Sequence, residues 1–162
     1  MDNKLEISSV ALGMAVEDDF REINWRDTMN YAAATGDTNS SYFDDSRSGG
    51  IIAPPMYAVA FTWPVLTGQR VEIPTTARHP AEISLRGVHA TQHLIFHRLI
   101  KPGQKIKSEM RIVSIQQTRA GVLQTRRFTA FDDQGNKVFT EYSGSMYRGV
   151  TCTDGGGSVE EI

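Results

Sequence analysis

The sequence predicts an α+β fold in which an antiparallel sheet wraps around one buried helix. Two observations lead to this fold: an almost wholly apolar helical segment in the first half of the chain, and a run of strand patterns separated by tight turns from Val88 onward. A helix without a polar face must be covered on most sides, and a curved sheet covers it. The chain has 162 residues, 40% of them hydrophobic, which is enough for one core and predicts a single domain.

The first helix is expected from Asn24 to Gly36. Asn24 is a good N-cap, Asp27 lies in the favourable first turn, and Gly36 is a typical C-terminal residue. Apolar residues recur at helical spacing at Trp25, Met29, Ala32 and Ala33. Residues 37–50 then read as a loop rich in turn-forming side chains, a kind of segment that often carries function.

The second helix is the apolar one. It is predicted to begin at Pro54 or Pro55, because proline suits a first turn, and to end at Trp63, because Pro64 disfavours continuation. It has almost no polar face, so we expect it to be buried. Residues 67–87 contain prolines and no clear period, which predicts a long irregular connection.

A strand is predicted from Val88, with alternating residues on two faces. The expected core face holds Val88, Ala90, Leu94 and Phe96, and the other face holds His89, Thr91, His93 and His97.

Further strands are expected over residues 105–119, 122–131 and 137–149, joined by tight turns. Together with the strand from Val88 they predict an antiparallel meander. The predicted domain runs over 18–149, between an N-terminal segment, 1–17, and a flexible tail, 150–162, whose three consecutive glycines leave little to bury.

Composition argues against several classes of partner. Seventeen basic and nineteen acidic residues give a net charge of -2, so we expect neither nucleic acid nor an anionic membrane as a partner. The longest apolar stretch is broken by prolines and is shorter than the roughly 20 residues of a membrane helix. Cys152 is the single cysteine and the N-terminus is charged, which together predict a cytoplasmic protein.

Three segments resemble the MaoC-like, (R)-specific enoyl-thioester hydratases. They are YAAATGDTNSSYFDD at 31–45, IIAPPMYAVAF at 51–61 and FHRLIKPGQKI at 96–106, in register over most of the chain. The resemblance implies a hot-dog fold with an overhang segment after the first helix. It also implies hydration of enoyl thioesters or dehydration of 3-hydroxyacyl thioesters in fatty acid metabolism, with coenzyme A or an acyl carrier protein bearing the substrate, no other cofactor, and a homo- or heterodimer.

The resemblance also carries over to individual residues. Asp37 matches the family's catalytic aspartate and Asn39 its turn asparagine, but Tyr42 stands where the family has a histidine. A phenol with a pKa of about 10 is a poor base near neutral pH. Pro55 replaces the glycine whose N–H polarises the thioester carbonyl, and proline has no N–H. The substrate-binding positions implied are Asn39, Tyr42, Pro55 and Met56.

These two departures are similar to the non-catalytic, FAS1-like dehydratase half of the family, which binds the acyl chain beside a catalytic partner. Two alternatives stay open: a self-sufficient homodimer using Asp37, and a non-enzymatic acyl-thioester binder. A thioesterase is less favoured, because residues 55–66 carry no carboxylate to activate water. Without the resemblance, Asp37 reads as an Asx-turn residue and Tyr42 as a packed aromatic.

Two further groups of side chains are ambiguous. His89, His93 and His97 share one predicted strand face, but no nearby carboxylate or cysteine completes a zinc set, so a solvated outer face is favoured and no metal site is predicted. A basic cluster could meet the phosphates of coenzyme A or a carrier-protein arm. Its members are Arg98, Lys101, Lys105 and Lys107.

Overall fold

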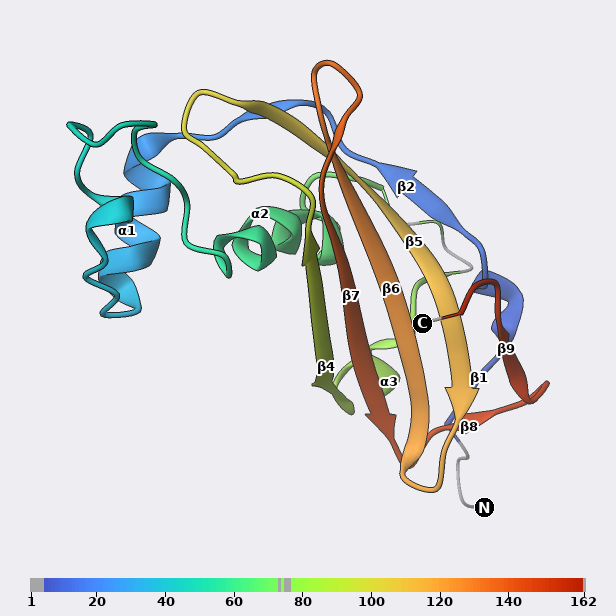
Figure 1. The fold of residues 1–162 in the computed structure, drawn as a ribbon. Helices are drawn as coiled ribbons and strands as arrows, with labels where there is room; N and C mark the ends of the chain where they lie inside the picture. The colour runs from blue at the N-terminus through green and yellow to red at the C-terminus, as the bar shows by residue number, and fades with distance from the viewer. Residues whose placement is uncertain (1–4, 73, 75–76, 162) are drawn as a thin grey trace.

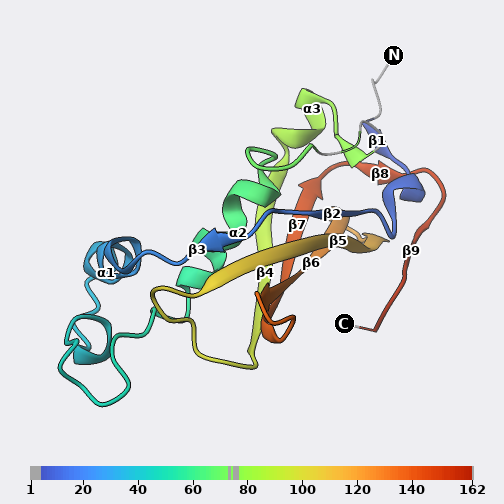
Figure 2. The same ribbon diagram turned by 90° about the horizontal axis from the view of Figure 1, so that it is seen from above.

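A computed structural model describes residues 5–72, 74 and 77–161. Its main element is a twisted antiparallel sheet with helix α2 against one face (Figures 1 and 2). The strand order is β2-β5-β6-β7-β4, and β3 and β9 also pair with β5. The bounds are β2 (Ala15–Glu17), β3 (Arg21–Glu22), β4 (Gly87–Phe96), β5 (Lys105–Gln117), β6 (Gly121–Asp132), β7 (Lys137–Arg148) and β9 (Gly156–Ser158). The predicted α+β class is confirmed.

The main core lies between α2 and this sheet. Ala58 and Phe61 of α2 pack among buried sheet residues, and the Phe61 ring meets that of Phe139 edge-on at 6.3 Å. Further along α2, Val65 packs on Met110 and Phe128. Burying each of the larger apolar side chains contributes roughly 1.5–3 kcal/mol, so the helix and the sheet stabilise each other.

Helix α1 (Trp25–Ala34) forms where its capping signals predict. The Asn24 side chain accepts a hydrogen bond from the Arg26 N–H at 2.8 Å, and Gly36 ends the helix with φ +69°. Its buried residues are Thr28 and Ala32. With the 3-10 turn η2 (Ser40–Tyr42), α1 lies to one side of the sheet, beside the N-terminal end of α2 (Figure 1).

Helix α2 (Tyr57–Leu66) differs from the prediction at both ends. It starts after the two prolines and continues through Pro64, so the predicted end at Trp63 is wrong. Pro64 removes one intrahelical N–H donor, but the helix resumes, since the Thr67 N–H bonds to the Trp63 carbonyl at 3.0 Å. The helix is also only partly buried: Trp63 is 52% exposed.

Strand β4 corrects two predictions. It pairs with β7 rather than β5, so the meander holds only for β5, β6 and β7. Its register also shifts between His89 and Thr91, which leaves Ala90 as an extra, bulged residue. A bulge inverts the alternation of faces. Phe96 therefore faces the core as predicted, but Val88 does not, and His89 is on the helix-facing side opposite Ser145.

The segments outside the predicted domain boundaries take part in the fold. β1 (Glu6–Ile7), preceding the 3-10 turn η1 (Ser9–Ala11), runs parallel to β8 (Thr151–Cys152), and β9 pairs with β5, so residues 150–161 are not a free tail. The connection 67–87 also contains a short helix, α3 (Ala81–Ser84), against the prediction of a fully irregular segment. Strand pairing, which composition does not reveal, orders the N-terminal and C-terminal segments.

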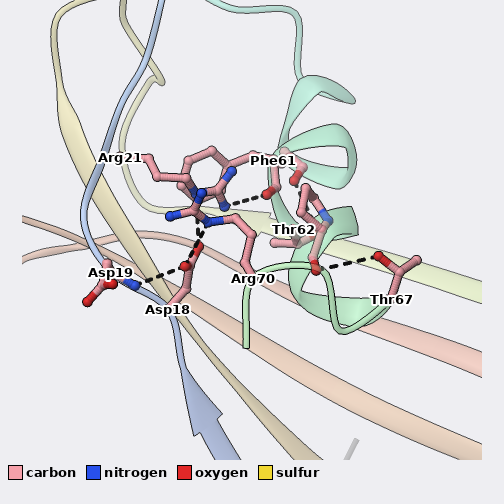
Figure 3. A network of polar contacts seen from close by, with 9 residues as sticks. Asp18, Asp19, Arg21, Phe61, Thr62, Thr67 and Arg70 are labelled. Atoms are coloured by element: carbon pink, nitrogen blue, oxygen red, sulfur yellow. Dashed lines mark hydrogen bonds and ion pairs between the residues drawn. The ribbon is translucent and has the colours of Figure 1, made fainter. Parts of the chain in front are cut away.

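A buried acidic residue ties three segments together (Figure 3). Asp18, 3% exposed, forms ion pairs with Arg21 at 2.8 Å and with Arg70 at 2.9 Å. Arg21 also donates to the Phe61 carbonyl at 2.6 Å and lies over the Phe61 ring, 3.8 Å from its centre. This network fixes the N-terminal strands and the connection after α2 to the helix.

Candidate functional site

Asp37 lies at the end of α1, where the Ala32 carbonyl accepts a hydrogen bond from its N–H at 2.9 Å. Its carboxylate accepts a hydrogen bond from the Asn39 N–H at 3.1 Å, and the Asn39 side chain accepts one from the Ser41 N–H at 3.0 Å. Both side chains are thus engaged in successive Asx turns. Asp37 is solvent-exposed, and the bond from Asn39 goes to its Oδ1, so Oδ2 can bond water or a ligand.

Tyr42, at the family's histidine position, is packed inward. It is 7% exposed and ends the η2 turn, and its N–H donates to the Asn39 carbonyl at 3.0 Å. The neighbouring Ser41 carbonyl accepts from the Ile52 N–H at 3.0 Å, which anchors the turn. The phenol therefore fills space under the overhang instead of standing as an exposed base beside Asp37.

The start of α2 has few backbone donors. Pro54 and Pro55 have none, and the Tyr57 N–H is taken by the Pro54 carbonyl at 2.9 Å. Met56 is the first residue after the prolines with an N–H, and its side chain is 47% exposed. Among the predicted positions, Met56 is thus the one whose backbone N–H could contact a thioester carbonyl.

An open hollow of about 550 Å³ lies beside the overhang. None of the predicted catalytic or substrate-binding residues lines it. Lys101 of the predicted basic cluster does, and its ammonium donates to the Gly49 carbonyl at 3.2 Å. The rest of the lining is Trp25, Met29, Phe43, Asp45, Gly50, Ile51 and Pro102. The hollow combines apolar walls with one cation at its edge.

His89 and His93 of β4, and His97 directly after it, do not share one face. His89 faces the helix side, whereas His93 stacks on Tyr142 and His97 Nε2 lies 3.1 Å from Thr140 Oγ1 on the opposite side. Over residues 5–72, 74 and 77–161, three or more metal-ligating side chains do not gather anywhere in the arrangement of a metal site. In the same ranges, α-helices long and apolar enough to cross a membrane are absent.

The sequence reasoning missed Glu141. This residue of β7 is 2% exposed and lies at the interface with α2. A charged residue two positions from the core residue Phe139 was an available signal, since alternate strand residues share a face.

Comparison with known proteins establishes the family. The model of the FAS1-like dehydratase domain region matches residues 11–141, and the chain belongs to this family. No curated protein sequence matches it.

Solved structures show the same fold. The chain is similar to the HadBC (3R-hydroxyacyl-ACP dehydratase) complex of Mycobacterium tuberculosis, with TM-score 0.69 and 17% identity over 86% of this chain and 99% of that one. It is similar to the (R)-hydratase PhaJ1 of Pseudomonas aeruginosa, with a TM-score of 0.62. The identity is 20%, over 93% of this chain and 87% of that one. It also resembles a MaoC-like dehydratase of Phytophthora capsici, with a TM-score of 0.74. The identity is 18%, over 95% of this chain but only 53% of that one. The predicted MaoC-like hot-dog fold is confirmed.

Proposed function

We propose that this protein is the acyl-binding subunit of an (R)-specific enoyl-thioester hydratase or 3-hydroxyacyl-thioester dehydratase, working beside a second hot-dog subunit that supplies the acid-base pair. The observation that carries the proposal is the packing of Tyr42. The family's base is replaced there by a buried phenol, so Asp37 has no partner for moving a proton. The HadBC complex is a dehydratase of more than one subunit, which supports this arrangement.

Strand β4 supports pairing with a second subunit. It is an edge strand that pairs with β7, and within the described residues its other edge carries no strand. Val88, Ile95 and Phe96 on this strand are each about 40% exposed. An uncovered edge with apolar side chains is a ready surface for adding another strand. We propose that the partner's sheet continues this one across β4, as a homo- or heterodimer.

The substrate would approach the overhang end of α2. Asp37, Asn39 and the Met56 N–H would face the substrate there, and Lys101, which lines the open hollow, would meet the phosphates of coenzyme A or a carrier-protein arm. We propose that the protein acts in the cytoplasm and needs no cofactor besides the thioester carrier. Asp37 then lines a shared site, and a histidine of the partner would complete the chemistry.

The test is an assay of crotonyl-CoA and decenoyl-CoA hydration by the purified chain, alone and mixed with a hot-dog protein that has the intact Asp and His motif. We expect no turnover alone and turnover by the mixture above that of the partner alone. Asp19→Ala, which removes an exposed carboxylate outside the segment from α1 to η2, is the matched control for Asp37→Ala. No gain in any mixture would overturn the proposal.

The same assay separates the alternatives. Turnover by the chain alone that Asp37→Ala abolishes and Asp19→Ala preserves would identify a self-sufficient homodimer. Acyl-CoA binding measured by calorimetry, without turnover in any mixture, would identify a binding module.

A further inference from the structure

A second cavity lies between the C-terminal half of α2 and strands β4 and β7. Its volume is about 230 Å³, and one side is formed by Val59 and Leu66 of α2. Polar side chains from both strands line it: His89, Glu141, Ser143 and Ser145. None of the predicted catalytic or substrate-binding positions borders it, so it is separate from the Asp37 turn.

Glu141 is the most buried polar group of this cavity. It is 2% exposed, and each carboxyl oxygen has one neighbour: Thr62 Oγ1 at 2.7 Å from Oε2, and Gln92 Nε2 at 2.9 Å from Oε1. The helix and both strands thus converge on one carboxyl group. His89, at the solvent-exposed end of the lining, is the ionisable residue whose charge acts on Glu141.

The hydrogen bonds suit both protonation states of the carboxyl. When Glu141 is ionised, it accepts from Thr62 and Gln92. When it is protonated it can donate to Thr62, because the Thr62 hydroxyl also lies 3.3 Å from the Ala58 carbonyl and 3.2 Å from the Val59 carbonyl, either of which can take its proton. Burial raises the pKa of Glu141, whereas the Thr62 and Gln92 bonds and His89 lower it. The net shift favours the neutral acid.

A buried carboxyl group contributes little to the stability of a hydrophobic core. Taking its charge out of water is unfavourable, and an apolar residue of similar size would stabilise the helix-sheet contact at least as well. A buried acid that instead lines an open cavity, with serine hydroxyls beside it, can donate to and accept from a ligand. The opposite wall of Val59 and Leu66 suits a hydrocarbon part.

We propose that this cavity is a binding site for a neutral organic group that carries a hydroxyl or carbonyl oxygen, with Glu141 as the hydrogen-bonding partner of that oxygen. A carbonyl accepts from the protonated acid, and a hydroxyl bonds to either of its states. A ligand with a hydrocarbon ring or short chain fits the apolar wall. The proposal goes beyond the acyl-binding role and does not depend on it.

The test uses cyclohexanol as probe, titrated into the full chain and followed by NMR shifts of backbone amides. We expect saturable shifts centred on Thr62, His89 and residues 141–145. Glu141→Leu should weaken binding about fivefold to tenfold, the value of one net hydrogen bond. Tyr142→Phe, on the opposite face of the same strand, should bind like the wild type. Glu141→Gln keeps a donor and an acceptor in the same space, so it should bind cyclohexanol nearly as tightly as the wild type. If the leucine variant fails to fold, the comparison of cyclohexanol with benzene still tests the proposal.

Benzene and cyclohexylammonium complete the experiment. Benzene binding at the cavity as tightly as cyclohexanol would show an apolar site and overturn the proposal. Tighter binding of the ammonium ion would show a carboxylate site for cations and overturn it equally. Absence of shifts at the cavity, or equal cyclohexanol affinity in the wild type and Glu141→Leu, would also overturn it. Because no enzyme assay is involved, these results are independent of the hydratase proposal.

Discussion

Thr62 of α2 and Glu141 of β7 are joined by a 2.7 Å hydrogen bond, with both side chains buried. This contact links the helix to the sheet through a buried hydrogen bond beside the apolar contacts of Phe61 and Val65. Its two partners lie 79 positions apart in the sequence, so the contact is purely tertiary.

Thr62→Val should destabilise the protein by about 1–3 kcal/mol, because it removes a donor from a buried carboxyl without changing the shape of the side chain. Thr67→Val is the matched control, because Thr67 is exposed at the end of the same helix and its hydroxyl donates to the Trp63 and Pro64 carbonyls. Urea unfolding of both variants measures the difference. Equal stabilities would show that the Thr62 hydroxyl contributes nothing through Glu141.

The pH dependence of stability should differ between the wild type and Glu141→Gln. The folded-state pKa of Glu141 lies above its ordinary value of 4.5, so its contribution is complete below that value and is lost as pH rises through the raised pKa. The free energy of unfolding of the wild type should therefore fall relative to that of Glu141→Gln as the pH rises above about 4.5.

The comparison with Glu141→Gln is needed because other groups titrate in the same range. Burial lowers the pKa of His79, so its contribution is present above its ordinary value of 6.5 and is lost on acidification. This opposite trend cancels in the difference between the two proteins. Denaturant unfolding of both proteins at several pH values measures this difference in the free energy of unfolding. A difference that stays constant with pH would contradict a raised Glu141 pKa.

Asp18→Asn should lower the free energy of unfolding by about 2–4 kcal/mol, because it leaves Arg21 without its buried counter-ion. Arg70 adds little to this loss, since its side chain is 38% exposed and water screens its charge. Asp19→Asn, exposed and next in sequence, should change stability little. Thermal and urea unfolding compare the two variants. If they behave alike, the Asp18 network of Figure 3 is not a stabilising one.

Gly121→Ala should destabilise the β5–β6 reversal by more than about 2 kcal/mol. Gly121 has φ +148°, and an added Cβ would lie 2.0 Å from the Tyr147 carbonyl oxygen. Gly135→Ala, also at positive φ but with no atom within 4 Å, should cost only about 1 kcal/mol of backbone strain. Denaturant unfolding of the pair separates steric overlap from backbone strain, and equal losses would contradict the overlap.

Local signals predicted the elements well where they act within a few residues. The Asn24 cap and Gly36 define α1, and the turn glycines separate β5, β6 and β7 almost where expected. The end of α2 was predicted wrongly because the rule that proline stops a helix ignores packing, and here the buried Val65 lies one residue beyond Pro64. The packing of Val65 in the core thus outweighs the low helix propensity of Pro64.

The two candidate sites differ in how much of each could be predicted from the sequence. Asp37, Asn39 and Tyr42 lie within one short segment, so a motif identifies them, although only the structure shows the Tyr42 phenol packed inward. The cavity around Glu141 is assembled from α2, β4 and β7. Its wall depends on the bulge at Ala90, which turns His89 toward the helix.

The sequence by itself determined the α+β class, the capped helix α1, the hairpin turns and the family. These depend on interactions between neighbours and on the period of apolar residues. Only the tertiary structure decided that β4 pairs with β7, that the N-terminal and C-terminal segments join the sheet, and that Glu141 meets Thr62. Strand order and register depend on contacts between residues distant in sequence, and no local pattern encodes them.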